Sequence, residues 1–281
     1  MYIAKLMKHR WEEEPISGIE EGYEGTFAIF FYGCTMKCVY CQNSKISRLT
    51  SKDLKQNTFD KKIQYNADEL SDEIIKVQNE NVASISFITG ALYVNEIVET
   101  IKLAKAKGLT LPIVYNSSGY EIISQIKKLD GLIDIYLPDF KYFDNELGKK
   151  YSKVPNYADV AKTCIEEMYR QVNLESTTCD TVKPNERKLI VRNLVLPGHT
   201  ENSKQIIKYL YDTYGDNIYM SVMSQYTPMT ENKELKNYPE LNRKLTKREY
   251  EKVTDYMLEL GIKNAYIQEG DVAKESFIPD F

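Results

Sequence analysis

Along most of the chain, short continuous apolar runs alternate with longer segments in which apolar residues recur every three or four positions. A continuous apolar run indicates a strand buried on both faces, whereas the recurring pattern is typical of a helix with one buried face. Six apolar runs predict strands, within residues 25–33, 83–90, 111–119, 132–141, 187–198 and 217–226. Helical segments separate them, so the pattern predicts a strand and a helix in alternation.

The helical segments carry start signals and apolar faces. Asn66 with Glu69, and Thr246 with Glu249, have the spacing of a capping box. The apolar faces comprise Leu70, Ile74 and Val77; Ile97, Ile101 and Ala104, with Gly108 as the stop; Ile122, Ile123, Ile126 and Leu129; and Tyr250, Val253 and Met257. Two further helices are predicted at 157–172 and 203–214.

This order of elements predicts an α/β protein, a partial (β/α)6 TIM-type barrel. Continuous apolar strands with helical crossovers favour a parallel sheet, and right-handed crossovers curl it. One domain is expected over 1–281, with the barrel core at about 26–225 and an extension at each end. Sites in such barrels lie at the carboxyl ends of the strands, so the residues that end the six runs are the candidates.

Charge and hydropathy narrow the partners. The net charge of −4 and the interspersed lysines and acids give no basic stripe, so nucleic acid is not expected as a partner. No apolar stretch approaches the length of a membrane span, so a membrane partner is not expected either. We expect a cytoplasmic protein, where thiols stay reduced.

Three of the five cysteines, Cys34, Cys38 and Cys41, lie within eight residues directly after the first predicted strand. Structural zinc takes four ligands, usually as two separated pairs, and no second pair follows. A 4Fe–4S cube held by three thiolates leaves one iron open for reaction, and this spacing favours such a site. The alternatives are a zinc site that borrows Cys164 or Cys179, or three ordinary buried thiols.

The two remaining cysteines cannot hold a second cluster with four thiolates, so one cluster is expected. Cys164 lies among helical residues and is expected to be a small buried side chain. Cys179 lies in a polar stretch and is expected to be exposed.

The spacing Cys-x3-Cys-x2-Cys, with Tyr40 before the last cysteine, resembles the signature of radical S-adenosylmethionine (SAM) enzymes. The resemblance implies that the open iron chelates SAM and that one electron splits a carbon–sulfur bond to give a 5′-deoxyadenosyl radical. The protein would place the reactants and exclude water.

Other segments extend the resemblance over nearly the whole chain: HRWEEEPISG, LPIVYNSSGY, LPDFKYFD, VRNLVLPGHTENS, MSQYTP and FIPDF. Together they resemble a little-characterised branch similar to pyruvate formate-lyase activating enzyme. The resemblance implies hydrogen abstraction from a glycine of a partner glycyl radical enzyme, with a reductant such as flavodoxin or ferredoxin.

The resemblance also implies SAM-binding residues and a monovalent cation beside the SAM carboxylate. These residues are Tyr40, Thr89, Gly90, Asn116, Ser117, Asp139, Lys141, Arg192, Met223 and Gln225, with the backbone of Leu137. The residues themselves leave alternatives open, because 116–119 is also good turn chemistry and Asp139 with Lys141 suits a surface ion pair. Arg192 interrupts an apolar strand, so it should meet a carboxylate or a ligand. His199 is expected to have no role.

One departure concerns Thr89-Gly90-Ala91, where the family commonly carries a Gly-Gly-Glu-like stretch whose acid holds the SAM amino group. Its absence supports a second hypothesis: an iron–sulfur or electron-transfer protein that has lost SAM cleavage. A small-molecule mutase or a methyltransferase remains an alternative within the enzyme class. Two polar segments, 47–65 and 227–243, are expected to border the barrel mouth. They either dock a protein substrate or are plain solvated loops.

Overall fold

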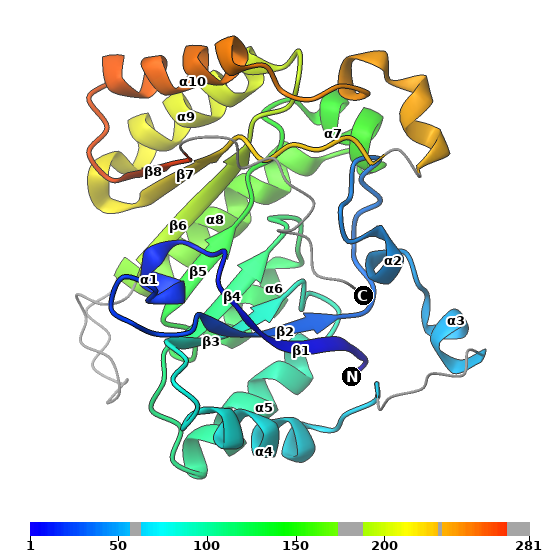
Figure 1. The fold of residues 1–281 in the computed structure, drawn as a ribbon, viewed down its shortest axis with the longest axis vertical. Coiled ribbons are helices and arrows are strands. Elements are labelled where there is room, and N and C mark those ends of the chain that lie inside the picture. The colour runs from blue at the N-terminus through cyan, green and yellow to red at the C-terminus, as the bar shows by residue number, and fades with distance from the viewer. Residues whose placement is uncertain (57–62, 174–187, 230–231, 269–281) are drawn as a thin grey trace.

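An eight-stranded sheet runs through the computed structural model, which describes all residues except 57–62, 174–187, 230–231 and 269–281, and the side chains of 51, 55 and 56 (Figure 1). The strands follow one another in chain order. They are β1 (Ile3–His9), β2 (Thr26–Phe31), β3 (Ser84–Ile88), β4 (Ile113–Ser117), β5 (Ile135–Pro138), β6 (Lys188–Leu194), β7 (Tyr219–Met223) and β8 (Ala265–Ile267). Strand β1 is antiparallel to β2, and all other neighbours are parallel.

Strands β2 to β7 are the six predicted strands, so the α/β class and the open barrel are confirmed. Their residues are almost all buried, as expected for a parallel sheet covered on both faces. The two outer strands, β1 and β8, were not predicted. Strand β8 has only three residues, and β1 mixes lysines with apolar residues and contains a bulge between Ile3 and Lys5.

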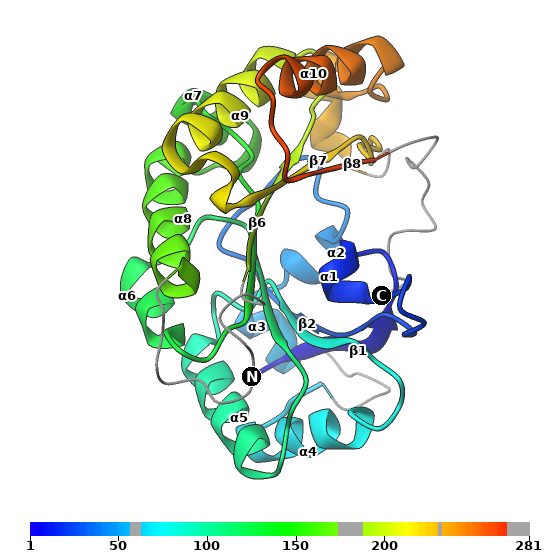
Figure 2. The ribbon, with the colours of Figure 1, turned by 90° about the vertical axis from the view of Figure 1, so that its left-hand side faces the viewer.

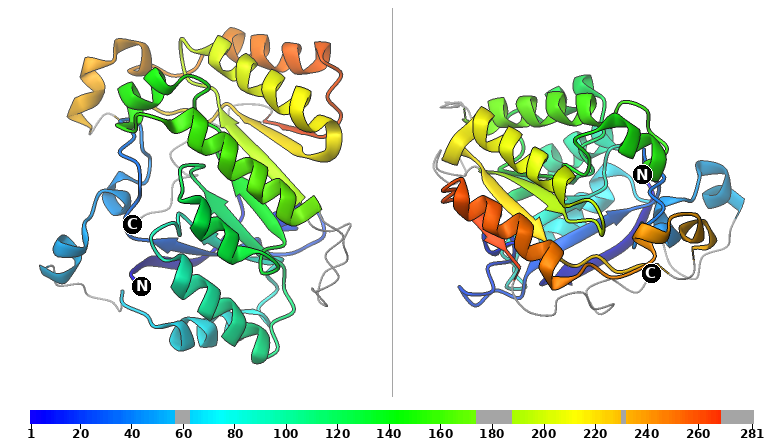
Figure 3. Two further views of the ribbon diagram at one scale, coloured as in Figure 1. Left: turned by 180° about the vertical axis from the view of Figure 1, so that it is seen from behind. Right: turned by 90° about the horizontal axis from the view of Figure 1, so that it is seen from above.

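Helices cover the convex face of the curved sheet (Figure 2). The longer ones are α4 (Ala67–Val77), α5 (Val94–Ala106), α7 (Asn145–Ser152), α8 (Tyr157–Asn173), α9 (Thr200–Tyr214) and α10 (Lys247–Glu259). Seen from behind in Figure 3, α8 and α9 cross the back of the sheet. None of the described helices is both long and apolar enough to cross a membrane.

Both predicted capping boxes are present, at Asn66 with Glu69 before α4 and at Thr246 with Glu249 before α10. The side chain of each cap residue accepts a hydrogen bond from the backbone N–H of the glutamate at the third helical position. The carboxylate of that glutamate accepts a hydrogen bond from the backbone N–H of the cap residue. The predicted faces of α4 and α5 are buried.

The helix predicted from Ile122, Ile123, Ile126 and Leu129 is present only as a short and irregular one. The segment forms a single turn, α6 (Ile123–Ile126), followed by the 3-10 helix η1 (Lys127–Leu129). Ile122 precedes the turn with an extended backbone, so it does not share the buried side of Ile126 and Leu129, and it is exposed. Helix α7 was also missed, since its sequence is mostly polar.

Helix α1 (Glu14–Ser17) lies on the concave side of the sheet, inside the open barrel (Figure 2). The short helices α2 (Ser44–Ser47) and α3 (Ser51–Gln56) follow the cysteine loop, and α3 lies at the outer edge of the molecule (Figure 1). Ile16 of α1 is fully buried against Val114, Ile135, Leu137 and Ile190 of the parallel strands. The carbonyl of Ile16 accepts a hydrogen bond of 2.7 Å from Ser84 Oγ at the amino end of β3. Helix α1 therefore closes the amino end of the barrel interior.

Three short 3-10 helices lie in the second half of the chain. Helix η3 (Gly215–Asn217) follows α9, whereas η4 (Lys233–Asn237) and η5 (Pro239–Leu241) lie in the connection after β7. The side chain of Asn232 donates a hydrogen bond to the carbonyl of Val39, and Gln42 Nε2 donates to the carbonyl of Gln225. The segment after β7 is thereby attached to the cysteine loop.

Candidate active site

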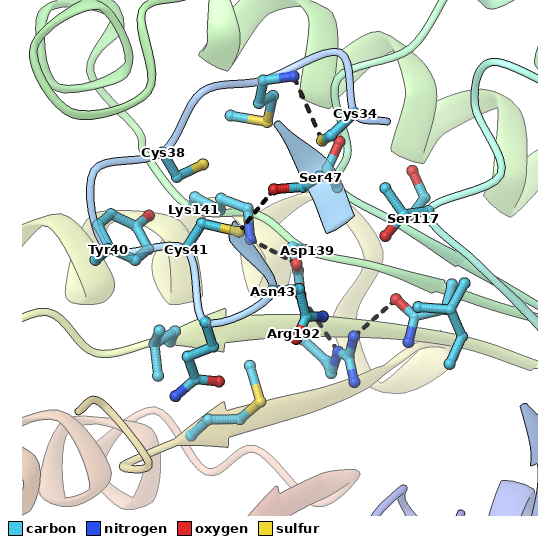
Figure 4. Close-up of a pocket in the computed structure, with 18 of the residues that line it drawn as sticks. Cys34, Cys38, Tyr40, Cys41, Asn43, Ser47, Ser117, Asp139, Lys141 and Arg192 are labelled. Carbon is cyan, nitrogen blue, oxygen red and sulfur yellow. Dashed lines mark hydrogen bonds and ion pairs between the residues drawn. The ribbon is translucent and has the colours of Figure 1, made fainter. Parts of the chain in front are cut away.

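A cavity of about 240 Å³ opens at the carboxyl ends of the strands, between the cysteine loop and the sheet (Figure 4). All three clustered cysteines line it. So do all of the predicted SAM-binding side chains except Gly90: Tyr40, Thr89, Asn116, Ser117, Asp139, Lys141, Arg192, Met223 and Gln225. The named residues lie between positions 34 and 225 of the sequence. The structure brings them together because the strands that carry them end at one edge of the sheet.

Gly90 lies just outside this cavity. A side chain at that position would meet the Cδ1 atom of Ile97 at 2.4 Å, so the residue is a close contact between β3 and helix α5. Its neighbour Thr89 has a positive φ of 61° and lines the cavity. The backbone N–H of Thr89 donates to the carbonyl of Asn116 at 3.0 Å, which holds the ends of β3 and β4 side by side.

The cysteine loop begins directly after β2 and is tied to two other parts of the chain. Gly33 has a positive φ of 88° and donates to the carbonyl of Ile46 at 3.0 Å. Lys37 N–H donates to the carbonyl of Ser152 at 3.1 Å, and Val39 N–H donates to that of Tyr151 at 2.8 Å. These bonds fasten the loop to α2 and to the end of α7, so the three sulfurs have defined positions.

Each cysteine sulfur has one hydrogen-bonding neighbour in the described structure. Met36 N–H lies 3.4 Å from Cys34 Sγ, Ser152 Oγ 3.0 Å from Cys38 Sγ, and Ser47 Oγ 3.3 Å from Cys41 Sγ. Burial raises the pKa of Cys34, and it raises the pKa of Cys38 to about 12. These thiols would therefore keep their protons in the absence of a metal, and metal binding would displace those protons into solvent.

The arrangement does not fit a single metal ion. Within the described residues, no group of three or more His, Cys, Asp or Glu side chains converges as the ligands of one ion do. Cys164 is buried on α8, donates to the carbonyl of Glu121 and does not line the cavity, so it is not a fourth ligand. Cys179 lies outside the described residues. Three thiols around one open space fit the larger iron–sulfur cube, which takes its ligands at separate corners.

Below the cysteines, four charged side chains form one network across the ends of β4, β5 and β6. Asp139 binds Lys141 Nζ at 2.6 Å and Arg192 Nε at 3.2 Å. Arg192 also donates to Glu12 at 2.9 Å and to Asn116 Oδ1 at 2.8 Å. The prediction that Arg192 meets a carboxylate is therefore confirmed, with two carboxylates instead of one.

The carboxylates of Asp139 and Glu12 differ in how much nearby positive charge offsets their burial. Burial alone would raise the pKa of Asp139, but Lys141 and Arg192 lower it below its ordinary value. Burial raises the pKa of Glu12 to about 7, because Arg192 compensates for it only in part. Glu12 is thus the carboxylate that remains short of positive charge.

Glu12 and His9 line the cavity and were not among the predicted residues. They come from the N-terminal segment that ends β1 and crosses the concave side of the sheet. Burial, with the nearby charge of Arg192, lowers the pKa of His9 to about 4, so its ring is neutral near pH 7. The segment HRWEEEPISG contributes to the family resemblance, but no role was predicted for its residues, because a run of acids such as 12–14 is usually solvated.

Ser117 is held by a residue behind the cavity wall. Its hydroxyl donates to Glu121, which also accepts from Tyr115 Oη at 2.8 Å. Burial raises the pKa of Glu121, although both hydroxyl groups oppose the shift. His199, expected to have no role, precedes α9, and its Nε2 atom lies 2.8 Å from Tyr151 Oη; it does not line the cavity.

An open, mostly parallel β/α barrel with a three-cysteine loop over the carboxyl ends of its strands defines a class of cluster-dependent radical enzymes. The sequence profile described as "Radical SAM superfamily" matches residues 28–210. The chain belongs to the radical SAM superfamily. Membership implies a 4Fe–4S cluster and SAM as cofactors, and Cys34, Cys38 and Cys41 are the cysteines that fit the cluster.

The chain is also similar to individual proteins. It is 32% identical over 232 residues to the uncharacterized protein MJ0674 of Methanocaldococcus jannaschii, covering 81% of this chain and 60% of that protein. SuiB of Streptococcus suis in its SAM complex gives a TM-score of 0.56 at 13% identity, covering 88% of this chain and 51% of SuiB. SuiB with its precursor peptide SuiA gives 0.54 at 14% identity, covering 86% and 48%. Methylornithine synthase (PylB) gives 0.54 at 14% identity, covering 86% and 63%.

These structural likenesses concern the fold. The chain spans only about half to two thirds of the length of each of these proteins.

Proposed function

We propose that this protein is a cytoplasmic radical SAM enzyme that cleaves SAM reductively and abstracts a hydrogen atom from a polypeptide, such as a glycine of a partner enzyme. The observation that carries the proposal is the single cavity shared by the three cysteines and the residues that the family resemblance implies for SAM. When bound, the cluster supplies one electron to the carbon–sulfur bond of SAM. The chain itself would position the reactants and keep water away.

Glu12 offers an answer to the missing acid at 89–91. The acids that line the cavity in the described structure are Glu12 and Asp139, and Asp139 is already bound to two cations. An ammonium group next to Glu12 would supply the positive charge that Arg192 alone does not. We therefore assign to Glu12 the recognition of the SAM amino group.

Other cavity residues receive the roles that the family resemblance implies. Asn116, Ser117 and Arg192 would contact SAM, and Met223 and Gln225 would border its nucleoside. Asp139 and the carbonyl of Leu137 would hold a monovalent cation, since a carboxylate and a carbonyl suit a hard ion. Lys141 forms an ion pair with the Asp139 carboxylate in this structure, so a bound cation and Lys141 would both have to contact that carboxylate.

The substrate proposal is supported by the shape of the barrel and by the segments beside its mouth. The sheet is open, and Ser47 and Thr227, at the beginnings of the two polar segments 47–65 and 227–243, line the cavity. A polypeptide could complete the wall between them and exclude water from the radical. The fold is compatible with such a substrate, because SuiB, which shares it, binds the peptide SuiA. Flavodoxin or ferredoxin is the proposed reductant.

The first experiment asks whether SAM is cleaved. The protein is reconstituted with iron and sulfide without oxygen, reduced with dithionite and given SAM, and 5′-deoxyadenosine is measured by chromatography. We expect formation in wild type and in Cys164→Ala, and loss of both the product and the cluster's visible absorbance in Cys38→Ala. An intact cluster without any 5′-deoxyadenosine would favour the electron-transfer alternative instead.

The second experiment concerns the substrate. A candidate partner enzyme is produced with glycine carrying two deuterium atoms and is added to the same reaction. Transfer of deuterium into 5′-deoxyadenosine would support hydrogen abstraction from glycine. Rapid stoichiometric cleavage of SAM driven by a small metabolite alone would contradict a polypeptide substrate.

A further inference from the structure

Three buried hydroxyl groups form a row behind the cysteine loop. Tyr40 Oη lies 2.6 Å from Tyr142 Oη, and Tyr142 Oη lies 2.7 Å from Ser152 Oγ. Ser152 Oγ in turn lies 3.0 Å from Cys38 Sγ. Tyr142 and Ser152 are fully buried and Tyr40 nearly so. Within the described part of the chain, none of the three hydroxyls has another hydrogen-bond partner. The row connects a cysteine to one fully buried tyrosine, Tyr142, and through it to Tyr40, which lines the cavity.

The direction of this row is determined by its end at Cys38. A sulfur that ligates iron carries no hydrogen and can only accept, so Ser152 must donate its hydrogen to it. Tyr142 must then donate to Ser152, and Tyr40 must donate to Tyr142. Every hydroxyl dipole therefore points toward the sulfur. Hydrogen bonds in such a chain polarise one another, and they act strongly where water is excluded.

The sulfur of Cys38 differs from the other two in the origin of its donor. Cys34 has a backbone donor two residues away, and Cys41 has Ser47, which lies only six residues later, at the end of the short helix α2. Ser152 comes from α7, more than 100 residues later, and two backbone hydrogen bonds between loop and helix set its place. The donor to Cys38 is thus supplied by the scaffold and not by the loop.

We propose that this row of hydroxyl groups, from Tyr40 through Tyr142 to Ser152, raises the reduction potential of the cluster by stabilising negative charge on the Cys38 sulfur. The inference rests on the proposed function only in that Cys38 ligates the cluster. On reduction, the cluster accepts one electron from a low-potential one-electron donor, and no proton moves and no bond breaks. The added charge spreads to the ligand sulfurs, where hydrogen-bond donors stabilise the reduced form more than the oxidised form.

The test measures the midpoint potential of the reconstituted protein without SAM, by a redox titration followed by the electron paramagnetic resonance signal of the reduced cluster. Ser152→Ala should shift the potential downward most, because it removes the donor itself. Tyr142→Phe should give a smaller downward shift, and Tyr40→Phe the smallest. Ser152→Thr keeps a hydroxyl and should remain close to wild type.

Ser203→Ala is the matched control. Ser203 is also buried, but its hydroxyl has no hydrogen-bond partner in the described structure and it does not line the cavity. The midpoint potential of the cluster in Ser203→Ala should equal that in wild type. A potential unchanged in Ser152→Ala, with iron and sulfide content intact, would overturn the proposal.

If Ser152→Ala does not hold a cluster, the midpoint potential of Tyr142→Phe tests the proposal instead, because this variant keeps Ser152 beside the Cys38 sulfur. A lowered potential in that variant supports the chain, and an unchanged one contradicts it. Because no SAM is present, these results are independent of whether the protein cleaves SAM. Absence of any cluster in wild type would instead defeat the proposed function.

Discussion

The cavity places two titratable side chains, His9 and Glu12, close to one buried arginine, and their pKa values move in opposite directions. Burial and then the charge of Arg192 lower the pKa of His9 from 6.5 to about 4. Burial raises the pKa of Glu12 from 4.5 to about 7, although Arg192 opposes the shift. Both residues thus tend to be neutral in the folded protein at a pH where the unfolded chain would charge them.

These shifts predict opposite pH dependences of stability. Between pH 4 and 6.5 the unfolded chain binds a proton at His9 that the folded protein does not, so this group's contribution rises with pH. Between pH 4.5 and 7 the folded protein holds a proton at Glu12 that the unfolded chain has lost, so this contribution falls as pH rises. Each difference amounts to roughly 3 kcal/mol across its window.

The measurement is urea unfolding of the cluster-free protein at several pH values from 4.5 to 7. Relative to wild type, Glu12→Gln should gain stability as pH rises, and His9→Gln should lose it. The exposed Glu21 lies in the same N-terminal segment, and Glu21→Gln should follow wild type. Parallel curves for Glu12→Gln and wild type would show that Glu12 titrates normally.

At the scale of elements, the close approach of two strand ends sets the position of Asp139. Gly119, just after β4, has a positive φ of 76°, and a Cβ atom there would lie 2.2 Å from the backbone oxygen of Asp139. The backbone oxygen cannot retreat without moving the end of β5. The absence of a side chain at Gly119 therefore lets β4 and β5 bring Ser117 and Asp139 to the same cavity.

Gly119→Ala should therefore lower the free energy of unfolding by more than backbone strain alone explains. Gly131 is a matched control, because its φ of 75° is nearly the same and a Cβ atom there would meet nothing within 4 Å. Gly131→Ala should cost about 1–2 kcal/mol of unfolding free energy from the left-handed conformation. Gly119→Ala should cost more and should weaken SAM binding about tenfold, a loss of about 1.4 kcal/mol. Thermal unfolding and equilibrium dialysis with labelled SAM measure the two effects, and equal results for both variants would contradict the explanation.

At the scale of the whole molecule, the N-terminal segment functions as the inner filling of an open barrel. It carries Glu12 into the cavity at the carboxyl ends of the strands and Ile16 to the amino end, where four apolar strand residues surround it. The sheet of eight strands, seven of them parallel, does not close on itself in the described part of the chain, so the interior needs material from elsewhere in the chain.

Ile16→Ala should lower the unfolding free energy by about 2–4 kcal/mol, because it leaves a cavity inside the barrel. It should also weaken SAM binding, since Glu12 lies four residues before it in the same segment. Ile122→Ala, at a side chain that is 68% exposed, should change stability little. Urea unfolding of both variants makes the comparison, and similar losses would show that Ile16 does not fill the interior.

The sequence by itself determined the six parallel strands, because each is a continuous apolar run that a covered parallel sheet requires. It also determined the two capped helices and the cysteine loop, since capping boxes and ligand spacing are local patterns. The ends of the predicted strands, such as Ser117 and Asp139, identified the edge where the cavity lies.

Only the tertiary structure decided which other residues reach that edge. Strand β1 mixes polar and apolar residues and gains its place by pairing with β2, and helix α7 carries little apolar pattern of its own. Glu12 enters the cavity because Ile16 is buried inside the barrel, and Ser152 reaches Cys38 because the loop pairs with the end of α7. The contacts between Glu12 and Arg192 and between Cys38 and Ser152 join residues more than 100 positions apart. No local pattern encodes them, because their energy comes from packing and burial in the folded chain.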